Sequence, residues 1–268
     1  MSNIKAVIFD WAGTTLDYGC MAPAVVFRRI FKKYKVPISM EEARQPMGAH
    51  KKVHIRKITE IPDVRTRWIA TYGNEPTEKD VENMFQDFIP EQMKVLTEYT
   101  DIIPGTLETI NTLKERGIKI GSTTGYMINM TELLKKAAAE KGYIPDSSVC
   151  AEEVPDGRPA PWMCVKNAEK LGVYPFNKIV KVDDTIPGVM EGLNAGMWTI
   201  GLAKSGNEMG MTLEEINEFE KNHPEEYKAK LDGAYKRMHD SGADYVVDSI
   251  ADVLPIIEKI EVKLLQTN

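Results

Sequence analysis

Short apolar runs alternate with helical patterns along most of the chain. The run Ile4–Phe9 is rich in β-branched and aromatic residues and leads directly into Asp10, which is typical of a buried strand. Similar runs follow from Pro104 onward, and we expect strands at residues 118–123, 147–151, 178–182, 198–201 and 245–247. Strands that alternate with helices of this length predict an α/β fold with a parallel sheet covered on both faces.

The helices expected between these strands are marked by apolar spacing, glycine and proline. They cover residues 107–116, 127–140, 161–172, 189–195 and 250–260, and Pro161 fits the first helical position of its helix. The Glu- and Lys-rich segment 206–241 is also expected to be helical, and its sequence suggests no function.

Residues 20–98 have a different pattern, with helical spacing and no convincing strand. Helices are expected at residues 25–35, 41–44, 50–59 and 64–72, and from residue 77 onward, where Pro90 should kink or interrupt the helix. Because this block follows the first strand, we predict a helical cap domain at residues 20–98 inserted into a core domain of residues 1–19 and 99–268.

Composition and charge narrow the protein class. The chain has 268 residues and a net charge of −6, which argues against nucleic acid as a partner. Three cysteines without a C-x-x-C pair are expected to be reduced thiols in a cytoplasmic protein. No apolar run approaches the length of a membrane helix, so we expect no membrane association.

Chemistry-bearing residues follow several of the expected strands. In parallel α/β sheets ligands bind beyond the carboxyl ends of the strands, which selects Asp10–Ala12, Thr123–Gly125, the loop at Arg158, and Asp183–Asp184. Converging carboxylates need a counter-charge, and Mg²⁺ with oxygen ligands supplies it. A carboxylate nucleophile, a metal, a hydroxyl and an arginine suit phosphoryl transfer. Taken singly, each piece also fits a helix cap or a surface residue.

These residues, in this order, resemble the motifs of the haloacid dehalogenase superfamily. Phe9–Asp17 is similar to the first motif, Thr124 to the second, Arg158 to the third (where Lys is commoner) and Asp183–Asp184 to the fourth. The resemblance implies a Rossmann-like parallel sheet core and an aspartyl-phosphate formed on Asp10. It also implies Mg²⁺ ligated by Asp10, the carbonyl of Ala12, and Asp184.

Ala12 narrows the resemblance to one subfamily. Most phosphatases and mutases of the superfamily carry a second Asp there as general acid, and alanine cannot transfer a proton. In having alanine at this position the chain resembles the phosphonoacetaldehyde hydrolases, or phosphonatases, which break a C–P bond. A carbanion leaves phosphorus only if a protonated imine on the next carbon takes up its electrons, so a cap lysine is required.

The cap segment Pro46–His54 resembles the motif that carries this lysine. The resemblance implies that Lys51 forms the Schiff base, that His54 shuttles protons, and that Met47 and Gly48 pack beside the imine. Lys51 and His54 share a helix face at i, i+3. The neighbouring cations His50, Lys52 and Arg56 are expected to lower the Lys51 pKa.

The same segment has other interpretations. Residues 51–57 also fit a solvated basic helix face or a phosphate-backbone contact, and His50 with His54 fits a transition-metal pair. Substrate contacts are further implied for Cys20, Gly125 and Tyr126, which alone would fit buried structural residues. Some relatives place a second acid four residues after Asp184, where this chain has Gly188, so the role of Asp183 stays open.

Together the patterns and the resemblance imply a cytoplasmic, Mg²⁺-dependent enzyme that hydrolyses the C–P bond of phosphonoacetaldehyde, a small-molecule phosphonate. The resemblance also implies a homodimer. Two alternatives remain: a phosphatase or phosphomutase acting on a small phosphate ester, and a non-catalytic binding protein of the same fold.

Overall fold

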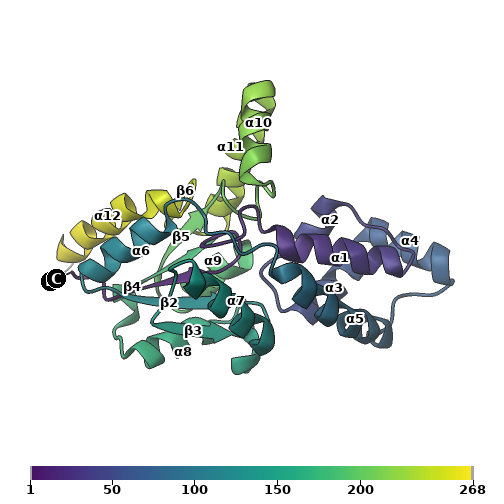
Figure 1. The fold of residues 1–268 in the computed structure, drawn as a ribbon, viewed down its shortest axis with the longest axis horizontal. Coiled ribbons are helices and arrows are strands. Elements are labelled where there is room, and N and C mark those ends of the chain that lie inside the picture. The colour runs from purple at the N-terminus through teal and green to yellow at the C-terminus, as the bar shows by residue number, and fades with distance from the viewer. Residues whose placement is uncertain (1, 267–268) are drawn as a thin grey trace.

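A six-stranded parallel sheet forms the centre of the molecule in a computed structural model that describes residues 2–266 (Figure 1). The strand order is β3-β2-β1-β4-β5-β6. This order reverses direction between β1 and β4, where doubly wound sheets open a crevice for ligands. The expected Rossmann-like parallel core is therefore confirmed. The strands are β1 (Ala6–Asp10), β2 (Lys119–Thr124), β3 (Ser147–Cys150), β4 (Ile179–Asp183), β5 (Trp198–Leu202) and β6 (Tyr245–Val247).

Both faces of the sheet are covered because alternate residues of β1 pack in opposite directions. Val7 and Phe9 belong to the main apolar core with α6 (Thr106–Glu115), α7 (Ile128–Glu140) and α12 (Val253–Gln266). Ala6 and Ile8 pack instead with α8 (Trp162–Leu171), and α9 (Ile186–Asn194) lies against β4 and β5. All five residues of β1 are buried, so Asp10 is delivered to the sheet edge by a rigid strand.

Five helices form a separate layer beside the carboxyl edge of the sheet, and we call them the cap (Figure 1). Its helices pack on one another around aromatic side chains; the rings of Phe27 and Phe88 stack at 4.6 Å between centroids. They are α1 (Met21–Lys33), α2 (Met40–Arg44), α3 (Lys51–Glu60), α4 (Pro62–Tyr72) and α5 (Glu78–Leu96).

Two segments join the cap to the core, and they run side by side. The N–H of Asp17 donates to the carbonyl of Asp101 at 3.0 Å, and Leu16 pairs with Ile102 in a single antiparallel bridge. Asp17 and Cys20 have φ values of 55° and 51°, which non-glycine residues seldom adopt. The first linker is therefore tightly shaped rather than extended.

The structure corrects two expectations about proline. Helix α5 runs unbroken from Glu78 to Leu96 through Pro90, so the expected interruption is wrong. Its apolar stripe, including Phe85 and Phe88, packs into the cap on both sides of the proline, and tertiary packing outweighs the lost hydrogen bond. Pro161 is the N-cap of α8 and not its first helical residue.

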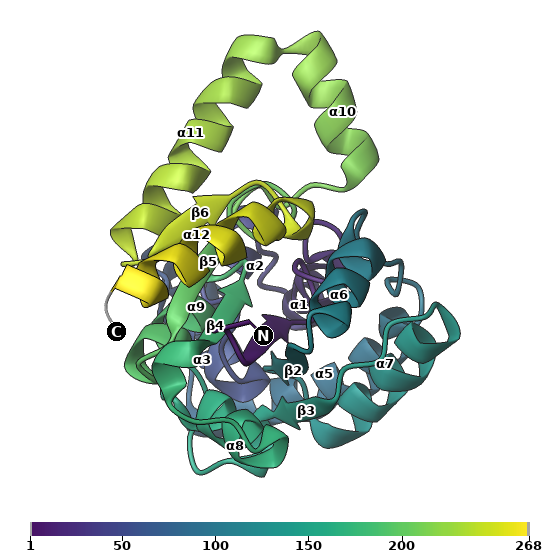
Figure 2. The same ribbon diagram turned by 90° about the vertical axis from the view of Figure 1, so that its left-hand side faces the viewer.

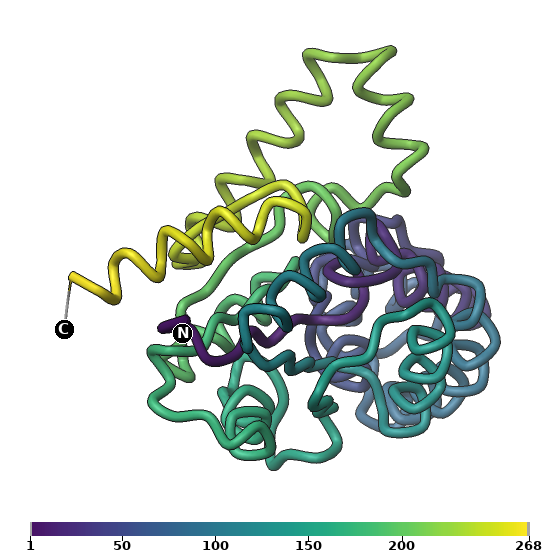
Figure 3. Tube along the Cα trace, turned by 60° about the vertical axis from the view of Figure 1, so that its left-hand side comes forward, coloured from purple at the N-terminus to yellow at the C-terminus, as the bar shows by residue number. Residues whose placement is uncertain are grey.

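The segment 206–241 is largely helical, as expected, and projects from the body as an antiparallel pair. Helix α10 (Leu213–Asn222) and the first part of α11 (Pro224–Asp240) stand away from the sheet in Figures 2 and 3, whereas the last part of α11 packs against β5 and β6. Three short 3₁₀ helices complete the fold at Ala151–Glu153, Phe176–Lys178 and Ile250–Asp252. Among residues 2–266, no helix is both long and apolar enough to cross a bilayer.

Candidate active site

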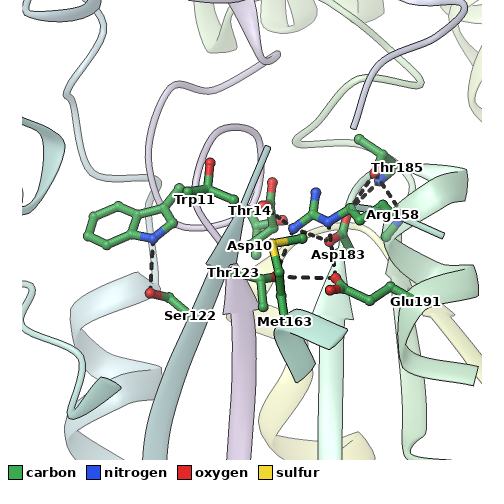
Figure 4. A network of polar contacts seen from close by, with 12 residues as sticks. Asp10, Trp11, Thr14, Ser122, Thr123, Arg158, Met163, Asp183, Thr185 and Glu191 are labelled. Carbon is green, nitrogen blue, oxygen red and sulfur yellow. Dashed lines mark hydrogen bonds and ion pairs between the residues drawn. The ribbon is translucent and has the colours of Figure 1, made fainter. Parts of the chain in front are cut away.

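The residues selected by the strand-end rule meet at one edge of the sheet. Asp10 ends β1, Thr124 ends β2 and Asp183 ends β4, and these three strands are neighbours. Figure 4 shows Asp10, Arg158 and Asp183 converging at this edge. The arrangement follows from the parallel topology, because every strand presents its carboxyl end to the same side.

Arg158 is the centre of a buried network of polar contacts (Figure 4). Its guanidinium donates to Asp10 Oδ1 at 2.6 Å, to Thr123 Oγ1 at 2.8 Å and to Glu191 Oε2 at 3.0 Å. A fourth contact reaches Asp183 Oδ2 at 3.3 Å. The carboxylates Asp10, Asp183 and Glu191 raise the pKa of Arg158 well above its ordinary value against the effect of burial. A permanently charged donor is thus fixed beside the Asp10 carboxylate.

Two further members of this network were not predicted as site residues. Lys181 is fully buried, and its Nζ contacts Thr123 Oγ1 at 2.6 Å, Asp183 Oδ2 at 2.9 Å and Glu191 Oε2 at 3.7 Å. One signal was present in the sequence: a lysine within the apolar run of β4 must find a carboxylate when the strand is buried. Glu191 gave no comparable signal, because it lies in an ordinary helical pattern.

The acidic groups outnumber the basic ones at this edge. Asp10, Asp183 and Asp184 present oxygen atoms within 4.8 Å of one another. Burial and then repulsion from Asp10 and Asp183 raise the pKa of Asp184 well above its ordinary value. Burial likewise raises the pKa of Asp10, although Arg158 opposes the shift. A bound divalent cation with a preference for oxygen ligands matches this excess of negative charge.

Asp184 is held in place by two donors. Thr14 Oγ1 donates to Oδ1 at 3.0 Å, and the N–H of Asn207 donates to Oδ2 at 2.8 Å. A Cβ at Gly13 would lie 2.2 Å from Oδ2, so only glycine leaves room for this carboxylate. The residues present therefore fit a metal site formed by the ends of β1 and β4.

The structure also accounts for Gly188, the departure from the fourth motif. The carboxylate of Asp183 accepts hydrogen bonds from the N–H and the hydroxyl of Thr185, at 2.9 and 2.7 Å, and forms an ion pair with Lys181. A Cβ at Gly188 would lie 2.0 Å from the carboxyl carbon of Asp183. Burial opposes ionisation, but Arg158 and Lys181 hold the pKa of Asp183 below its ordinary value. Glycine at 188 is what lets the Asp183 carboxylate lie here.

A small cavity between the cap and the sheet edge collects most of the predicted site residues. It brings the cap residues Met47, Gly48 and Lys51 together with residues from three strand ends. Its lining is Asp10, Ala12, Cys20, Pro23, Met47, Gly48, Lys51, Thr124, Gly125, Tyr126, Arg158 and Thr185. Pro23 and Thr185 were not predicted from the sequence; both are ordinary helix-start residues there.

Lys51 reaches this cavity from the first turn of α3 and is only 4% exposed. Its Nζ lies 4.5 Å from the ring centroid of Tyr126 and 5.9 Å from that of Phe27. Burial lowers the Lys51 pKa to about 8, with a further contribution from Arg158. The direction of the shift was expected, but its main cause is burial and not the neighbouring cations.

Those neighbouring cations have partners of their own. Lys52 forms an ion pair with Glu82, and Arg56 forms one with Glu78 on the exposed side of the cap. Residues 51–57 therefore have two faces: one contacts solvent, and the other carries Lys51 into the cavity. Lys52 and Arg56 thus belong to a solvated basic face, as one interpretation predicted, whereas Lys51 points into the cavity, as the other predicted.

His54 lies behind Lys51 and does not line the cavity. The imidazole is fully buried, stacks on Phe27 at 3.8 Å between centroids, and its Nε2 lies 2.8 Å from the carbonyl of Ala43. Because a carbonyl only accepts, Nε2 carries the proton and Nδ1 has a free lone pair. Burial lowers the His54 pKa well below its ordinary value, with a further effect of Lys51, so the ring is neutral.

The cap rests directly on the core around the cavity. A Cβ at Gly48 would lie 2.5 Å from Thr185 Oγ1, and φ at Gly48 is +89°. A Cβ at Gly125 would lie 3.0 Å from the carbonyl of Ala49. Two of the predicted glycines are therefore required by close approach between the layers, and the cap is closed over the site.

Cys20 and Tyr126 both face the cavity while being buried. Cys20 is 3% exposed and forms the N-cap of α1, and burial raises the pKa of its thiol, which is therefore neutral. The Tyr126 hydroxyl is buried and has no hydrogen-bond partner within residues 2–266. All three cysteines are free and buried, as expected for reduced thiols.

Comparison with known proteins gives the family. Residues 4–196 match the model of the haloacid dehalogenase-like hydrolases. The chain is 45% identical over 259 residues to a phosphonoacetaldehyde hydrolase of Bacillus cereus, covering 97% of each protein. It is 47% identical to part of a bifunctional phosphonoacetaldehyde hydrolase/aminoethylphosphonate transaminase of Clostridioides difficile. It spans 41% of that longer protein, whereas 99% of this chain is matched.

The fold comparison agrees with the sequence comparison. A crystal structure of a phosphonoacetaldehyde hydrolase like protein from Oleispira antarctica superposes with a TM-score of 0.95 at 38% identity. The match covers 99% of this chain and 95% of that one. The chain is a hydrolase, and it belongs to the phosphonoacetaldehyde hydrolase family of the haloacid dehalogenase-like hydrolases.

Proposed function

We propose that this chain hydrolyses the C–P bond of phosphonoacetaldehyde, giving acetaldehyde and phosphate through a Lys51 Schiff base and an Asp10 aspartyl-phosphate. The observation that carries the proposal is that Lys51 and Asp10 line one buried cavity in which Ala12 occupies the place of a general acid. Full-length relatives named for this reaction support the substrate.

The first step is imine formation at Lys51. The neutral amine attacks the aldehyde carbon, and the carbinolamine takes up a proton on its hydroxyl and loses water to give a protonated imine. Burial favours the neutral amine before attack, because the Lys51 pKa is about 8. The ring of Tyr126, 4.5 Å from Nζ, faces the cation that forms afterwards. The closed cap limits the access of water while the imine forms.

The second step is attack of Asp10 on phosphorus. A bond forms between an Asp10 oxygen and phosphorus, the C–P bond breaks, and its electron pair moves through carbon to the iminium nitrogen, which leaves an enamine. Arg158, 2.6 Å from Asp10 Oδ1, orients the carboxylate and faces the phosphonate oxygens with Thr124. No acid is needed at Ala12, because the leaving group is not an alkoxide.

The last steps restore the enzyme. The enamine takes a proton at carbon, water hydrolyses the resulting imine to acetaldehyde and free Lys51, and a second water hydrolyses the aspartyl-phosphate. His54 is the proposed proton carrier of the imine steps: its neutral ring follows Lys51 by one helical turn, and its Nδ1 has no partner within residues 2–266. Because the ring does not line the cavity, this role requires a bridging water or a movement of the cap.

Asp10, the carbonyl of Ala12 and Asp184 are the proposed ligands of Mg²⁺. The cluster of three carboxylates and the raised pKa of Asp184 support a divalent cation at this place. When bound, Mg²⁺ would neutralise charge on the phosphonate oxygens and keep Asp10 ionised.

One assay separates this proposal from its alternatives. The protein is incubated with Mg²⁺ and either phosphonoacetaldehyde or a panel of sugar phosphates, and both acetaldehyde and phosphate are measured. We expect equal amounts of acetaldehyde and phosphate from phosphonoacetaldehyde, and little phosphate from the esters, since Ala12 cannot protonate an alkoxide. Turnover of esters alone would establish a phosphatase, and no turnover at all would favour a binding protein.

A further inference from the structure

The loop after β5 lies directly on Asp184. The N–H of Asn207 donates to Asp184 Oδ2 at 2.8 Å. A Cβ at Gly206 would lie 2.1 Å from the Cβ of Asp184, so no other residue fits between them. The position of segment Ser205–Asn207 therefore determines where one of the two donors to Asp184 lies.

A cap arginine contacts the same loop. Arg44 ends α2, and its guanidinium is buried between the cap and the core. It reaches Asn207 Oδ1 at 3.4 Å, and Asn207 Nδ2 lies 3.5 Å from the backbone carbonyl of Arg44. A Cβ at Gly210 would lie 2.6 Å from Arg44 Nε, so the loop also packs against the guanidinium. Arg44 thus joins the cap to the loop through both its guanidinium and its backbone carbonyl.

The same arginine holds the first linker. It donates to the carbonyls of Gly19 and Cys20 at 2.7 and 3.2 Å. The N–H of Gly19 donates to the carbonyl of Ser205 at 2.7 Å. Gly19 is therefore bound at its carbonyl by Arg44 of the cap and at its N–H by the loop after β5. Gly19 has a φ of +84°, and a Cβ there would lie 2.3 Å from the carbonyl oxygen of Met211. In this structure the linker is therefore held from both sides, by Arg44 of the cap and by the loop after β5.

The charge of Arg44 has no direct counterpart. Within residues 2–266 no carboxylate lies within ion-pair distance of this guanidinium, and its Nε has no hydrogen-bond partner. Burial lowers the pKa of Arg44, and the more distant carboxyl groups of Asp17 and Asp184 oppose that shift. Burying a cation that is held only by uncharged groups costs free energy of folding. An uncharged side chain could attach the cap to the core without this cost, so we expect Arg44 to have a further role.

We propose that Arg44 is a positioning residue that couples closure of the cap to the metal site, acting through Asn207 on Asp184. The inference rests on Asp184 as a metal ligand, as in the proposed function. When the cap closes, Arg44 fixes the linker and segment Ser205–Asn207, and the Asn207 N–H then orients Asp184. Coupling is reciprocal, so metal binding also favours the closed cap.

Metal affinity tests this coupling without reference to turnover. Mg²⁺ binding to metal-free protein is measured by calorimetry for the wild type, Arg44→Gln, Arg44→Lys, Asn207→Ala and the double variant Arg44→Gln/Asn207→Ala. We expect Mg²⁺ affinity to fall about tenfold in Arg44→Gln, with a similar loss in Asn207→Ala and no further loss in the double variant. Arg67→Gln is the matched control, because Arg67 is a cap arginine that pairs with Glu42 and should leave affinity unchanged.

A second measurement reports the reciprocal effect. Amide hydrogen exchange at Gly19 and Cys20 should slow on addition of Mg²⁺ in the wild type and much less in Arg44→Gln. Wild-type Mg²⁺ affinity in Arg44→Gln, or in Asn207→Ala if the arginine variants do not fold, would overturn the coupling. Wild-type protein that binds Mg²⁺ but does not release acetaldehyde would refute the proposed function and leave this inference intact; failure of the wild type to bind Mg²⁺ would refute the inference.

Discussion

At the scale of single residues, the surroundings of Lys51 and Asp10 determine their chemistry more than their neighbours in sequence do. Motif spacing predicted both residues, and the structure brings them to one cavity. Spacing did not reveal Lys181 and Glu191, because their role arises only when β4 and α9 pack against Arg158. The cause of the lowered Lys51 pKa was missed for the same reason: burial is a property of the fold and not of the adjacent charges.

The Lys51 pKa predicts a pH dependence. Only the neutral amine forms an imine, and lowering the pKa from 10.5 to about 8 raises the neutral fraction at pH 7 from about 0.03% to about 9%. We expect kcat/KM to rise with pH and to level off above an apparent pKa near 8. A profile that falls between pH 7 and 9 at constant Mg²⁺ would contradict a neutral Lys51 as the attacking group.

The close contact of Gly188 with Asp183 predicts that alanine is destabilising at this helical glycine but not at the helical glycine Gly233. In Gly188→Ala the new Cβ meets the Asp183 carboxylate and displaces it from Lys181 and Arg158, so we expect the free energy of unfolding to fall by about 1–3 kcal/mol with a marked loss of turnover. Gly233→Ala is the control: a Cβ there meets only the flexible end of Arg237, and helix propensity favours alanine. Equal behaviour of the two variants in urea unfolding would disprove the packing argument.

At the scale of elements, the hydrophobic pattern predicted nearly every strand and helix, and the errors lie at prolines. Local rules predicted a kink or an interruption at Pro90, but α5 continues through it because its buried stripe is held by α1 and α3. The pattern also indicated that residues 206–241 are helical. It did not indicate that α10 and the first part of α11 project from the body, since that arrangement depends on tertiary contacts such as those of α11 with β5 and β6.

The unbroken α5 predicts a stabilising substitution. Pro90 is exposed, so Pro90→Ala loses little packing and restores an N–H donor to the helix. We expect the free energy of unfolding to rise by about 1–2 kcal/mol, without a change in turnover. Asn83→Ala, at another exposed position of α5, should give a smaller gain in the free energy of unfolding. A Pro90→Ala protein with a lower melting temperature than the wild type would show that the proline stabilises the helix at this position.

At the scale of the whole molecule, the sheet supplies the carboxylates and the cap supplies the lysine, and neither layer forms the site alone. The sequence predicted both layers and their order, because an inserted helical block after the first strand must lie at the carboxyl edge. It could not predict how closely they meet, which depends on Gly48 at Thr185 and Gly125 at Ala49. The closed arrangement also buries more carboxylates than cations.

This charge imbalance predicts that metal removal destabilises the fold. Mg²⁺ at about one hundred times its dissociation constant should stabilise the wild type by about 2.7 kcal/mol, because binding relieves repulsion among Asp10, Asp183 and Asp184. The melting temperature with Mg²⁺ and with a chelator gives the measurement. Asp184→Asn should narrow the difference between the two; an unchanged difference in that variant would exclude Asp184 as a ligand.

The most direct test of the central claim is to trap the imine with borohydride in the presence of phosphonoacetaldehyde and to map the modified peptide by mass spectrometry. We predict a single adduct on Lys51: a two-carbon group without phosphorus in the wild type, and a group that retains phosphorus in Asp10→Ala, which forms the imine but cannot cleave it. An adduct on another lysine, or loss of phosphorus from the Asp10→Ala adduct, would contradict the account.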